Sequence, residues 1–343
     1  MKKVVSILLV VVLCGAFMLA GCAPQQAAPA ASEAAKESAA APQESAAAKA
    51  DDSAAAAGGK RVAFINPFVS SPYMAAYVTA AMAKADELGI ELTMMDAEGN
   101  SQKAYDLAQS AIGQKYDGIM LLSPDTKSSI SIVKMIEKAG IPLIITNAKA
   151  DESVQKDLTY VGADLEKQGE MAGEMALEVM GEKGGKICII EGPGGHDAAL
   201  SRSAGFKKAV EGKPGVEIIG VQQADWDRAI AMQKMDDFLV QFPEIDVVFC
   251  HDDNMAIGAV EAAKAAGRLK DITVLGVGAS IDGLAAIKSG EMFGTVLQAP
   301  GEEGSKSVQA IVDTMDGKTL DKWIVLDCDK ITKENVDEYK GEW

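Results

Sequence analysis

The feature that most constrains the fold is a regular alternation of short β-branched runs with longer helical stretches, which starts after the first sixty residues. The first cycle has the apolar run RVAFIN at 61–66 and then a stretch at 72–88, in which Met74, Val78 and Met82 recur on one helical face. Apolar strands that alternate with amphipathic helices are typical of parallel sheets covered by helices on both faces. The alternation therefore predicts an α/β fold.

The same cycle recurs along the chain. Further strands are predicted at 91–95, 118–122, 142–145, 186–191, 216–222, 247–251, 272–276 and 295–297. Helices are predicted at 102–114, 127–139, 165–180, 197–211, 227–241, 254–266, 280–289 and 302–315. Glycines that end helices follow four helical stretches, namely Gly89, Gly140, Gly267 and Gly290. These units are too many for one doubly wound sheet, so the periodicity leaves two Rossmann-like domains or a closed barrel open.

The acidic composition argues against one class of partner. The 343 residues include 33 Lys and Arg against 50 Asp and Glu, which gives a formal net charge of -17. Nucleic acid is not an expected partner, because phosphate binding requires concentrated lysine and arginine. The two histidines, His196 and His251, leave little material for a histidine-based zinc site.

Three short motifs resemble cofactor or cation sites without their full pattern. GVGASI at 276–281 starts like a dinucleotide fingerprint but has Ile281 in place of the third glycine. GEKGGK at 181–186 has the composition of a P-loop, yet it precedes a strand and lacks the Ser or Thr after its lysine. The run at 252–254, Asp-Asp-Asn, is better interpreted as a helix N-cap with a ligand contact than as a cation loop. We therefore expect no cofactor, no metal and no catalysis.

Residues 1–21 are predicted to be an export signal, because two lysines near the start precede a long apolar stretch. The ending Leu19-Ala20-Gly21-Cys22 resembles the lipobox of bacterial lipoproteins. This resemblance implies that Cys22 is lipidated and that the chain is cleaved just before it. The alternative, an uncleaved membrane helix, gives no reason for two small residues before a cysteine.

The segment that follows is low in complexity. Residues 23–59 consist mainly of Ala, Ser, Glu and Pro and contain no large apolar side chain. Such a segment cannot bury enough surface to offset its ordering entropy. We therefore predict a lipidated Cys22 and a disordered tether over 22–59, followed by a globular body held at a membrane.

Three cysteines remain in the body, namely Cys188, Cys250 and Cys328. Their odd number and wide spacing give neither a disulfide framework nor a metal site. Buried free thiols are the preferred interpretation, because free cysteine behaves as a small hydrophobe. A single bridge from Cys328 to either of the others stays open.

Several segments of the body match, in the same order, the motifs of one family. They are SSPYM at 70–74, GIMLLSP at 118–124, GIPLIITN at 140–147, GPGGHDAALSRSAGF at 192–206, ADWDR at 224–228, FCHDDNMAIG at 249–258 and TVLQAP at 295–300. With these motifs the chain from residue 60 to about residue 327 resembles periplasmic sugar-binding proteins of the ribose-binding type. These are ABC transporter solute-binding lipoproteins, and their fold is also that of the ligand-binding half of lac-repressor-like regulators.

The resemblance implies a periplasmic-binding-protein type I fold. Two doubly wound parallel-sheet lobes are joined by a three-crossing hinge near Ala163, Gln298 and Asp327. The implied limits are 60–163 plus 299–327 for the N-terminal lobe and 164–298 plus 328–343 for the C-terminal lobe. The ligand would lie between the lobes, at the carboxyl ends of the strands, and a hinge motion would close them.

Carried over position by position, the resemblance assigns eight residues to the ligand site. They are Ser71, Tyr73, Met74, Asn147, Arg202, Trp226, Asp252 and Gln298. Sugars offer C–H faces to aromatic rings and hydroxyl edges to polar side chains, so Tyr73 and Trp226 are expected at the faces of the ligand. Structural alternatives stay open: a core position for Tyr73, a surface position for Trp226 or Arg202, a helix cap for Asp252 or Asn147, and a hinge hydrogen bond for Gln298.

Four positions depart from the ribose-binding pattern. Ser71 stands in place of an asparagine, Met74 in place of a second stacking phenylalanine, Ala148 in place of an arginine, and Gly278 in place of a carboxylate. The loss of one arginine and one carboxylate removes two strong contacts to hydroxyl groups. The predicted ligand is therefore not ribose in its usual pose. It is a larger or less hydroxylated sugar, a polyol or another small polar molecule.

The resemblance implies a binding protein and not an enzyme. We expect an extracytoplasmic, monomeric protein, lipid-anchored in the periplasm or at the outer face of the cytoplasmic membrane, that delivers a sugar-like ligand to the permease subunits of an ABC importer. Two alternatives stay open: a sensor that presents a sugar-like quorum molecule to a membrane receptor, and a secreted α/β enzyme. A transcription-factor role is excluded, because 1–59 offers an export signal and a tether where a DNA-binding helix-turn-helix would stand.

Overall fold

The computed structural model describes residues 59–343. The predicted export signal, lipidation at Cys22 and all but the last residue of the predicted tether lie outside the described residues. Within the described part, none of the helices combines the length and the apolar character needed to cross a membrane.

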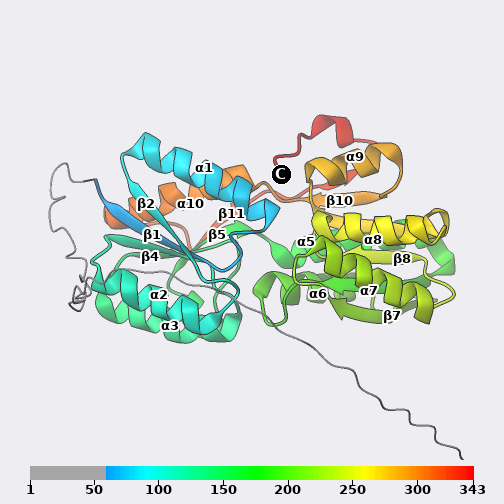
Figure 1. Cartoon of the computed structure of the whole chain (residues 1–343), viewed down its shortest axis with the longest axis horizontal. Coiled ribbons are helices and arrows are strands. Elements are labelled where there is room, and N and C mark those ends of the chain that lie inside the picture. The colour runs from blue at the N-terminus through cyan, green and yellow to red at the C-terminus, as the bar shows by residue number, and fades with distance from the viewer. Residues whose placement is uncertain (1–58) are drawn as a thin grey trace, which may run out of the picture. The chain divides into compact units, whose positions relative to one another are not determined.

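The described residues form two six-stranded sheets (Figure 1). The first sheet has the order β11-β5-β4-β3-β1-β2, and all its pairings are parallel. Its strands are β1 (Arg61–Asn66), β2 (Glu91–Asp96), β3 (Gly118–Leu121), β4 (Leu143–Thr146), β5 (Thr159–Ala163) and β11 (Trp323–Leu326). Its helices are α1 (Pro72–Leu88), α2 (Ser101–Gly113), α3 (Thr126–Ala139), α4 (Glu152–Gln155) and α10 (Pro300–Met315). We call this sheet with its helices lobe 1.

The second sheet has the order β12-β10-β9-β8-β6-β7, and only β12 runs antiparallel to its neighbour. Its strands are β6 (Gly185–Glu191), β7 (Val216–Gln223), β8 (Val247–Cys250), β9 (Thr273–Gly278), β10 (Gly294–Leu297) and β12 (Lys330–Thr332). Its helices are α5 (Leu165–Met180), α6 (Asp197–Val210), α7 (Arg228–Gln241), α8 (Asp253–Ala265) and α9 (Ile281–Ser289), with the 3₁₀ turns Gly181–Lys183, Leu269–Asp271 and Val336–Glu338. We call this sheet with its helices lobe 2.

Each sheet separates two apolar cores, because successive side chains of a strand point to opposite faces. In β1, Val62 and Phe64 join the core under α1 and α10, whereas Ala63 and Ile65 join the core under α2 and α3. In lobe 2 the corresponding cores lie under α7, α8 and α9 and under α5 and α6. A fully buried Val, Ile or Phe side chain contributes about 1.5–3 kcal/mol relative to an exposed one. Because both faces of a strand such as β1 are buried, its sequence is an almost unbroken apolar run.

The helix ends follow local capping. Asp125 accepts a hydrogen bond from the Ser128 N–H at 2.8 Å and thereby begins α3. Pro72 occupies the first turn of α1, where a missing N–H costs little. The four glycines predicted to end helices all have positive φ, between 67° and 82°. Helix ends were therefore predictable to within one or two residues.

Several elements were not predicted, and one architecture is wrong. No strand was predicted at β5, β11 or β12, and no helix at the short α4. β11 is partly exposed at the sheet edge, with Val325 51% exposed, so it lacks the apolar run of a strand buried on both faces. The closed barrel that periodicity left open is wrong, since each sheet ends in two edge strands.

The chain passes between the two lobes three times, after β5, after β10 and after β11. The first passage leads into α5, the second into α10 and the third into β12. The predicted fold class, two doubly wound lobes joined by a three-crossing hinge, is thereby confirmed. The residue limits given above for the lobes stay a prediction.

The three cysteines of the body are buried and free. The prediction of buried free thiols is confirmed, and Cys328 forms no bridge with Cys188 or Cys250. Burial raises the pKa of Cys188 to about 12, so this thiol stays protonated at neutral pH.

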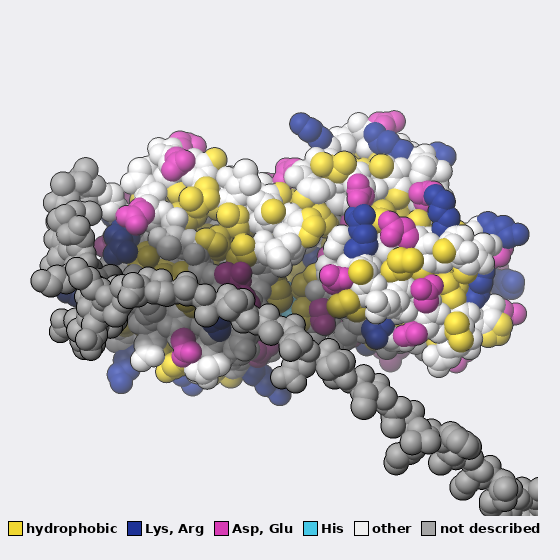
Figure 2. Space-filling view, in the orientation of Figure 1, with side chains coloured by type: hydrophobic (Ala, Val, Ile, Leu, Met, Phe, Trp, Pro, Cys, Tyr) yellow, Lys and Arg dark blue, Asp and Glu magenta, His cyan; other side chains and the backbone are white. Residues whose placement is uncertain are grey.

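Charged side chains of both signs are interspersed on the face drawn in Figure 2. Lys208 lies 2.5 Å from Glu170, and Arg228 lies 2.6 Å from Asp282. Exposed ion pairs contribute about 0–1 kcal/mol each. They reduce repulsion on an acidic surface, while the apolar cores hold the fold.

Candidate ligand-binding site

A cavity lies between the lobes, and all eight residues predicted for the ligand site line it. From lobe 1 these are Ser71, Tyr73, Met74 and Asn147, and from lobe 2 they are Arg202, Trp226, Asp252 and Gln298. Five residues that were not predicted line it as well: Phe68, His196, Ala198, Val277 and Trp343.

The position of the cavity follows from the direction of the strands. Phe68 stands in the loop after β1, Asn147 directly after β4, Asp252 shortly after β8 and Gln298 directly after β10. Because parallel strands end at the same edge of a sheet, the loops that follow them converge there. Each lobe thus presents the carboxyl ends of its strands to the cavity.

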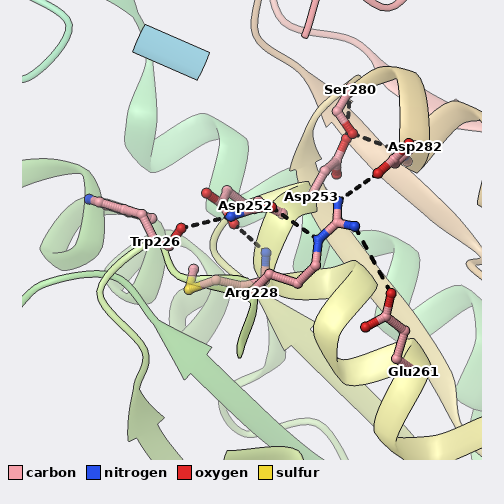
Figure 3. Close-up of polar contacts among 10 residues, drawn as sticks. Trp226, Arg228, Asp252, Asp253, Glu261, Ser280 and Asp282 are labelled. Atoms are coloured by element: carbon pink, nitrogen blue, oxygen red, sulfur yellow. Dashed lines mark hydrogen bonds and ion pairs between the residues drawn. The ribbon is translucent and has the colours of Figure 1, made fainter. Parts of the chain in front are cut away.

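Trp226 stands in a constrained loop after β7. Asp225 and Trp226 both have positive φ, 52° and 64°, which is rare for a bulky side chain and marks a strained loop. Asn254 donates to the Trp226 carbonyl at 2.9 Å, and Arg228 donates to the Asn254 side chain at 3.1 Å (Figure 3). A Cβ at Gly192 would lie 2.2 Å from the Trp226 ring, so glycine there lets the ring pack over the loop after β6.

Arg202 is buried in lobe 2, only 3% exposed, and its guanidinium holds the loops around it. Its Nε and Nη2 donate to Gln168 Oε1 at 3.0 and 2.9 Å. Nη2 also donates to Gln298 Oε1 at 2.6 Å, and Nη1 donates to the His251 carbonyl at 2.6 Å. Most of its donors are therefore used inside the protein, so Arg202 is not a surface cation and its main observed role is to order the cavity wall.

Asp252 both lines the cavity and begins α8. Its Oδ1 accepts from the Met255 N–H at 2.7 Å, which confirms the N-cap interpretation. Burial raises the pKa of Asp252 to about 7 and outweighs the opposing effects of that hydrogen bond and of nearby Arg202. At neutral pH the Asp252 carboxyl is therefore only partly ionised beside Arg202.

A second carboxyl group lies behind the lobe 1 wall. Glu303, in α10, is 1% exposed; it accepts a hydrogen bond from the Tyr73 hydroxyl and another from Asn147 Nδ2, the latter at 3.0 Å. Burial raises its pKa to about 7. Asn147 itself has a φ of 66°, a conformation that asparagine tolerates better than most residues. Tyr73 and Asn147 are thus positioned from behind by one buried acid.

His196 enters the cavity among aromatic rings. Its ring lies edge-on to Phe68, with centroids 5.1 Å apart, and edge-on to Trp226 at 5.9 Å. Burial lowers its pKa to about 3, so the imidazole is neutral at physiological pH. Both ring nitrogens are buried, and neither has a hydrogen-bond partner among residues 59–343. A neutral imidazole offers one donor and one acceptor, so the cavity contains unused hydrogen-bonding capacity.

The unpredicted residues differ in how visible they were in the sequence. Phe68 shares a loop with Ser71, and His196 stands inside the glycine-loop motif at 192–206. These two positions could have been included on spacing alone. Trp343 gave no local signal, since it is distant along the chain from every other residue of the cavity.

Comparison with known proteins shows the family to which the chain belongs. A family model described as a periplasmic binding protein domain matches residues 62–319. The ribose import binding protein RbsB of Bacillus subtilis is 30% identical over 75% of this chain and 82% of its own length. The xylitol-binding protein of Mycolicibacterium smegmatis is 32% identical over 74% of this chain and 72% of its own length.

A solved structure is similar throughout the described part. An ABC transporter solute-binding protein from Bacillus halodurans, with bound myo-inositol, has a TM-score of 0.78 and 28% identity. The match covers 84% of this chain and 100% of that one. The similarity therefore includes both lobes.

Proposed function

Because the chain belongs to the periplasmic binding protein family, we propose that it is an extracytoplasmic, lipid-anchored solute-binding protein of an ABC importer. It binds a neutral sugar or polyol in the cavity between the lobes, with Tyr73 and Trp226 against the faces of the ligand. Members of this family that resemble the chain are named as binding and transport proteins, which supports a solute-binding role over catalysis.

The observation that carries the ligand class is the buried, unpaired His196 among aromatic rings. A neutral imidazole with both nitrogens unused costs free energy unless a ligand pairs with it. Hydroxyl groups can donate to one nitrogen and accept from the other. A neutral polyhydroxy compound supplies such groups without bringing a further charge beside Arg202 and Asp252, which line the same cavity.

The departures from the ribose pattern support a ligand other than ribose. Ala148, in the place of an arginine, is 2% exposed and packs into the core of lobe 1. Gly278 offers no carboxylate. Two of the strong contacts of the ribose pattern are therefore missing, whereas the relatives reported above include a xylitol-binding protein and a solute-binding protein with bound myo-inositol.

A thermal-shift panel tests this proposal. The full chain is heated with D-ribose, D-allose, xylitol or myo-inositol, because a ligand that binds only the folded state raises the melting temperature. At about 100 times its Kd a ligand adds about 2.7 kcal/mol. We expect a hexose or polyol to raise the melting temperature more than D-ribose does. A shift with D-ribose alone would contradict the ligand assignment, and no shift with any compound would contradict the sugar class.

Anchoring requires lipidation of Cys22, and import requires a permease partner. Two of the relatives reported above are named as import or transporter components, which favours import over the sensor interpretation. We expect the full chain to partition into detergent, and Cys22→Ser to partition into the aqueous phase. Equal partitioning of the two proteins would contradict a lipid anchor. Capture of a sensor kinase in place of a permease by the crosslinked protein would favour the alternative function.

A further inference from the structure

The segment 341–343 lies beside the cavity and contacts both lobes. The Trp343 carbonyl accepts from the Ile281 N–H, at the start of α9 in lobe 2, at 2.7 Å. The Glu342 carboxylate accepts from the Gly301 N–H, in the first turn of α10 in lobe 1, at 2.7 Å. A carboxylate is favourable at the amino end of a helix. We call 341–343 the strap.

The strap places the Trp343 ring where the ribose pattern has a carboxylate. A Cβ added at Gly278 would lie 2.4 Å from Trp343 Cζ2, which is too close for any real side chain. Gly278 also has a φ of 139°, in the region that favours glycine. A side chain at position 278 and the ring of Trp343 therefore exclude each other, and the glycine departure has a structural counterpart.

The Trp343 ring lines the cavity and carries an unused hydrogen-bond donor. It lies edge-on to Tyr73, with centroids 5.7 Å apart and an interplanar angle of 81°. Its Nε1 is buried, and the described part of the chain supplies no acceptor for it. Buried indole N–H groups usually find a partner. The remaining candidate is an acceptor on a molecule in the cavity that Trp343 lines.

We propose that Trp343 is a ligand-contact residue that sets specificity in place of the missing carboxylate. The proposal rests on the proposed function. A carboxylate accepts hydrogen bonds from two hydroxyl groups, whereas an indole donates one and otherwise presents C–H surface. The edge of the ligand beside β9 therefore carries one hydrogen-bond acceptor and few hydroxyl donors. This is the chemistry of a deoxy position, a ring ether oxygen or the C–H face of a cyclic polyol.

A melting experiment without ligand tests the shared space. Gly278→Ala is compared in the wild-type chain and in Trp343→Ala, because residues in contact show non-additive effects. We expect Gly278→Ala to lower the melting temperature in both, but by at least about 2 °C less when Trp343 is absent. The loss in melting temperature that remains in Trp343→Ala reflects the positive φ of Gly278.

Gly290→Ala is the matched control for this experiment. Gly290 also has positive φ, 82°, but a Cβ there would meet nothing within 4 Å. Gly290→Ala should lower the melting temperature by the same amount in the wild-type chain and in Trp343→Ala. Additive effects for both glycines would overturn the placement of Trp343 against Gly278.

Calorimetric titration tests the contact with ligand. The full chain is titrated with myo-inositol, xylitol and D-ribose, and Trp343→Ala should lower the affinity for the tightest of these by about tenfold or more. Trp343→Phe keeps an aromatic ring but removes the N–H, so an intermediate loss is expected. Trp323→Phe is the control, because the Trp323 Nε1 donates to the Gly162 carbonyl at 2.9 Å and Trp323 lies outside the cavity lining.

The outcomes separate the two proposals. Unchanged affinity in Trp343→Ala, with ligand still bound by the wild-type chain, would overturn the role of Trp343 and leave the proposed function intact. A wild-type chain that binds none of the three compounds would contradict the proposed function together with the ligand class given for Trp343. The melting experiment would still decide whether Trp343 and Gly278 share space.

Discussion

The two walls of the cavity are built differently. Lobe 1 presents uncharged side chains, such as Tyr73 and Asn147, and keeps its carboxyl group, Glu303, behind them. Lobe 2 presents its charged groups, Arg202 and Asp252, to the cavity itself. The lobe 2 wall is also cross-linked by Arg202, whereas each lobe 1 side chain is held separately or through Glu303.

This difference suggests a division of labour. A wall with fixed charged groups and oriented loops is ordered before ligand arrives and can provide recognition. A wall of uncharged side chains can close over the ligand without bringing a second set of charges into a small space. We therefore expect substitutions in lobe 2 to cause the largest losses of stability and ligand affinity. Substitutions in lobe 1 should mainly affect the contact with the ligand that is made on closure.

The largest effect is expected for Arg202→Met. The change leaves the acceptors of Gln168, Gln298 and His251 buried without their donor, and each buried unpaired group costs about 1–3 kcal/mol. We expect a loss of about 3 kcal/mol or more in the free energy of unfolding by urea, together with loss of ligand binding. Lys208→Met, at an exposed position on the same helix, should cost under about 1 kcal/mol. Equal effects of the two changes would contradict the cross-linking role.

The pH dependence of stability compares the two carboxyl groups. Burial raises the folded-state pKa of Glu303 and of Asp252 to about 7, above their ordinary values near 4. At these two groups the folded state therefore binds more protons than the unfolded state between about pH 4 and pH 7, and their contribution to stability falls as the pH rises through this window. Each group should contribute a loss of up to about 3 kcal/mol from pH 5 to pH 8, measured by urea unfolding as the difference between the wild type and the variant that lacks that carboxyl group.

Single replacements show which lobe contributes to the pH dependence of stability. Glu303→Gln should remove the lobe 1 part and leave the part due to Asp252, whereas Asp252→Asn should do the reverse and still cap α8. The double variant should lose both falling contributions and keep the opposite one of the buried histidines, whose lowered pKa makes stability rise with pH. If the stability difference between the wild type and Glu303→Gln does not fall from pH 5 to pH 8, the sign for Glu303 is wrong.

A smaller effect on stability and a clear effect on binding are expected for Trp226→Ala. The ring lines the cavity, and its loop is anchored through the backbone carbonyl by Asn254, which the substitution leaves in place. Removal of a central aromatic contact costs about 2 kcal/mol, or about 30-fold in Kd. Titration of the tightest sugar or polyol measures it. A change under about threefold would place the ligand elsewhere.

The smallest effect is expected for Ser71→Ala in lobe 1. Ser71 occupies the N-cap position of α1, yet its side chain makes no capping hydrogen bond. Stability should therefore change by under about 0.5 kcal/mol. Any loss of ligand affinity, expected to be about two- to fivefold, then reports a direct contact on closure. A large loss of stability would indicate a structural role for Ser71.

Much of the fold could be predicted, because its signals are local. Strands buried on both faces, such as β1 and β8, stand out as apolar runs, and residues such as Asp125 and Gly140 mark helix ends. The missed β12 has only three residues and pairs antiparallel with β10. Its pairing depends on where the chain returns after the third crossing, which no local pattern encodes.

The site was predictable to the extent that each residue stands in a motif near a strand end. Asn147, Asp252 and Gln298 follow β4, β8 and β10, so sequence order fixes their position. Trp343 could not be found in this way, because it reaches the cavity only through the hydrogen bonds of the strap to α9 and α10. The departure at Gly278 indicated extra space but not what fills it.

The central claim is that one neutral sugar or polyol binds between the two unlike walls. Isothermal titration of the full chain with myo-inositol and xylitol, in parallel with Trp226→Ala and Ser71→Ala, tests it most directly. We predict one site per chain for at least one compound, with affinity reduced strongly in Trp226→Ala and slightly in Ser71→Ala. Binding that both variants leave unchanged, or no binding to the wild-type chain, would contradict the account.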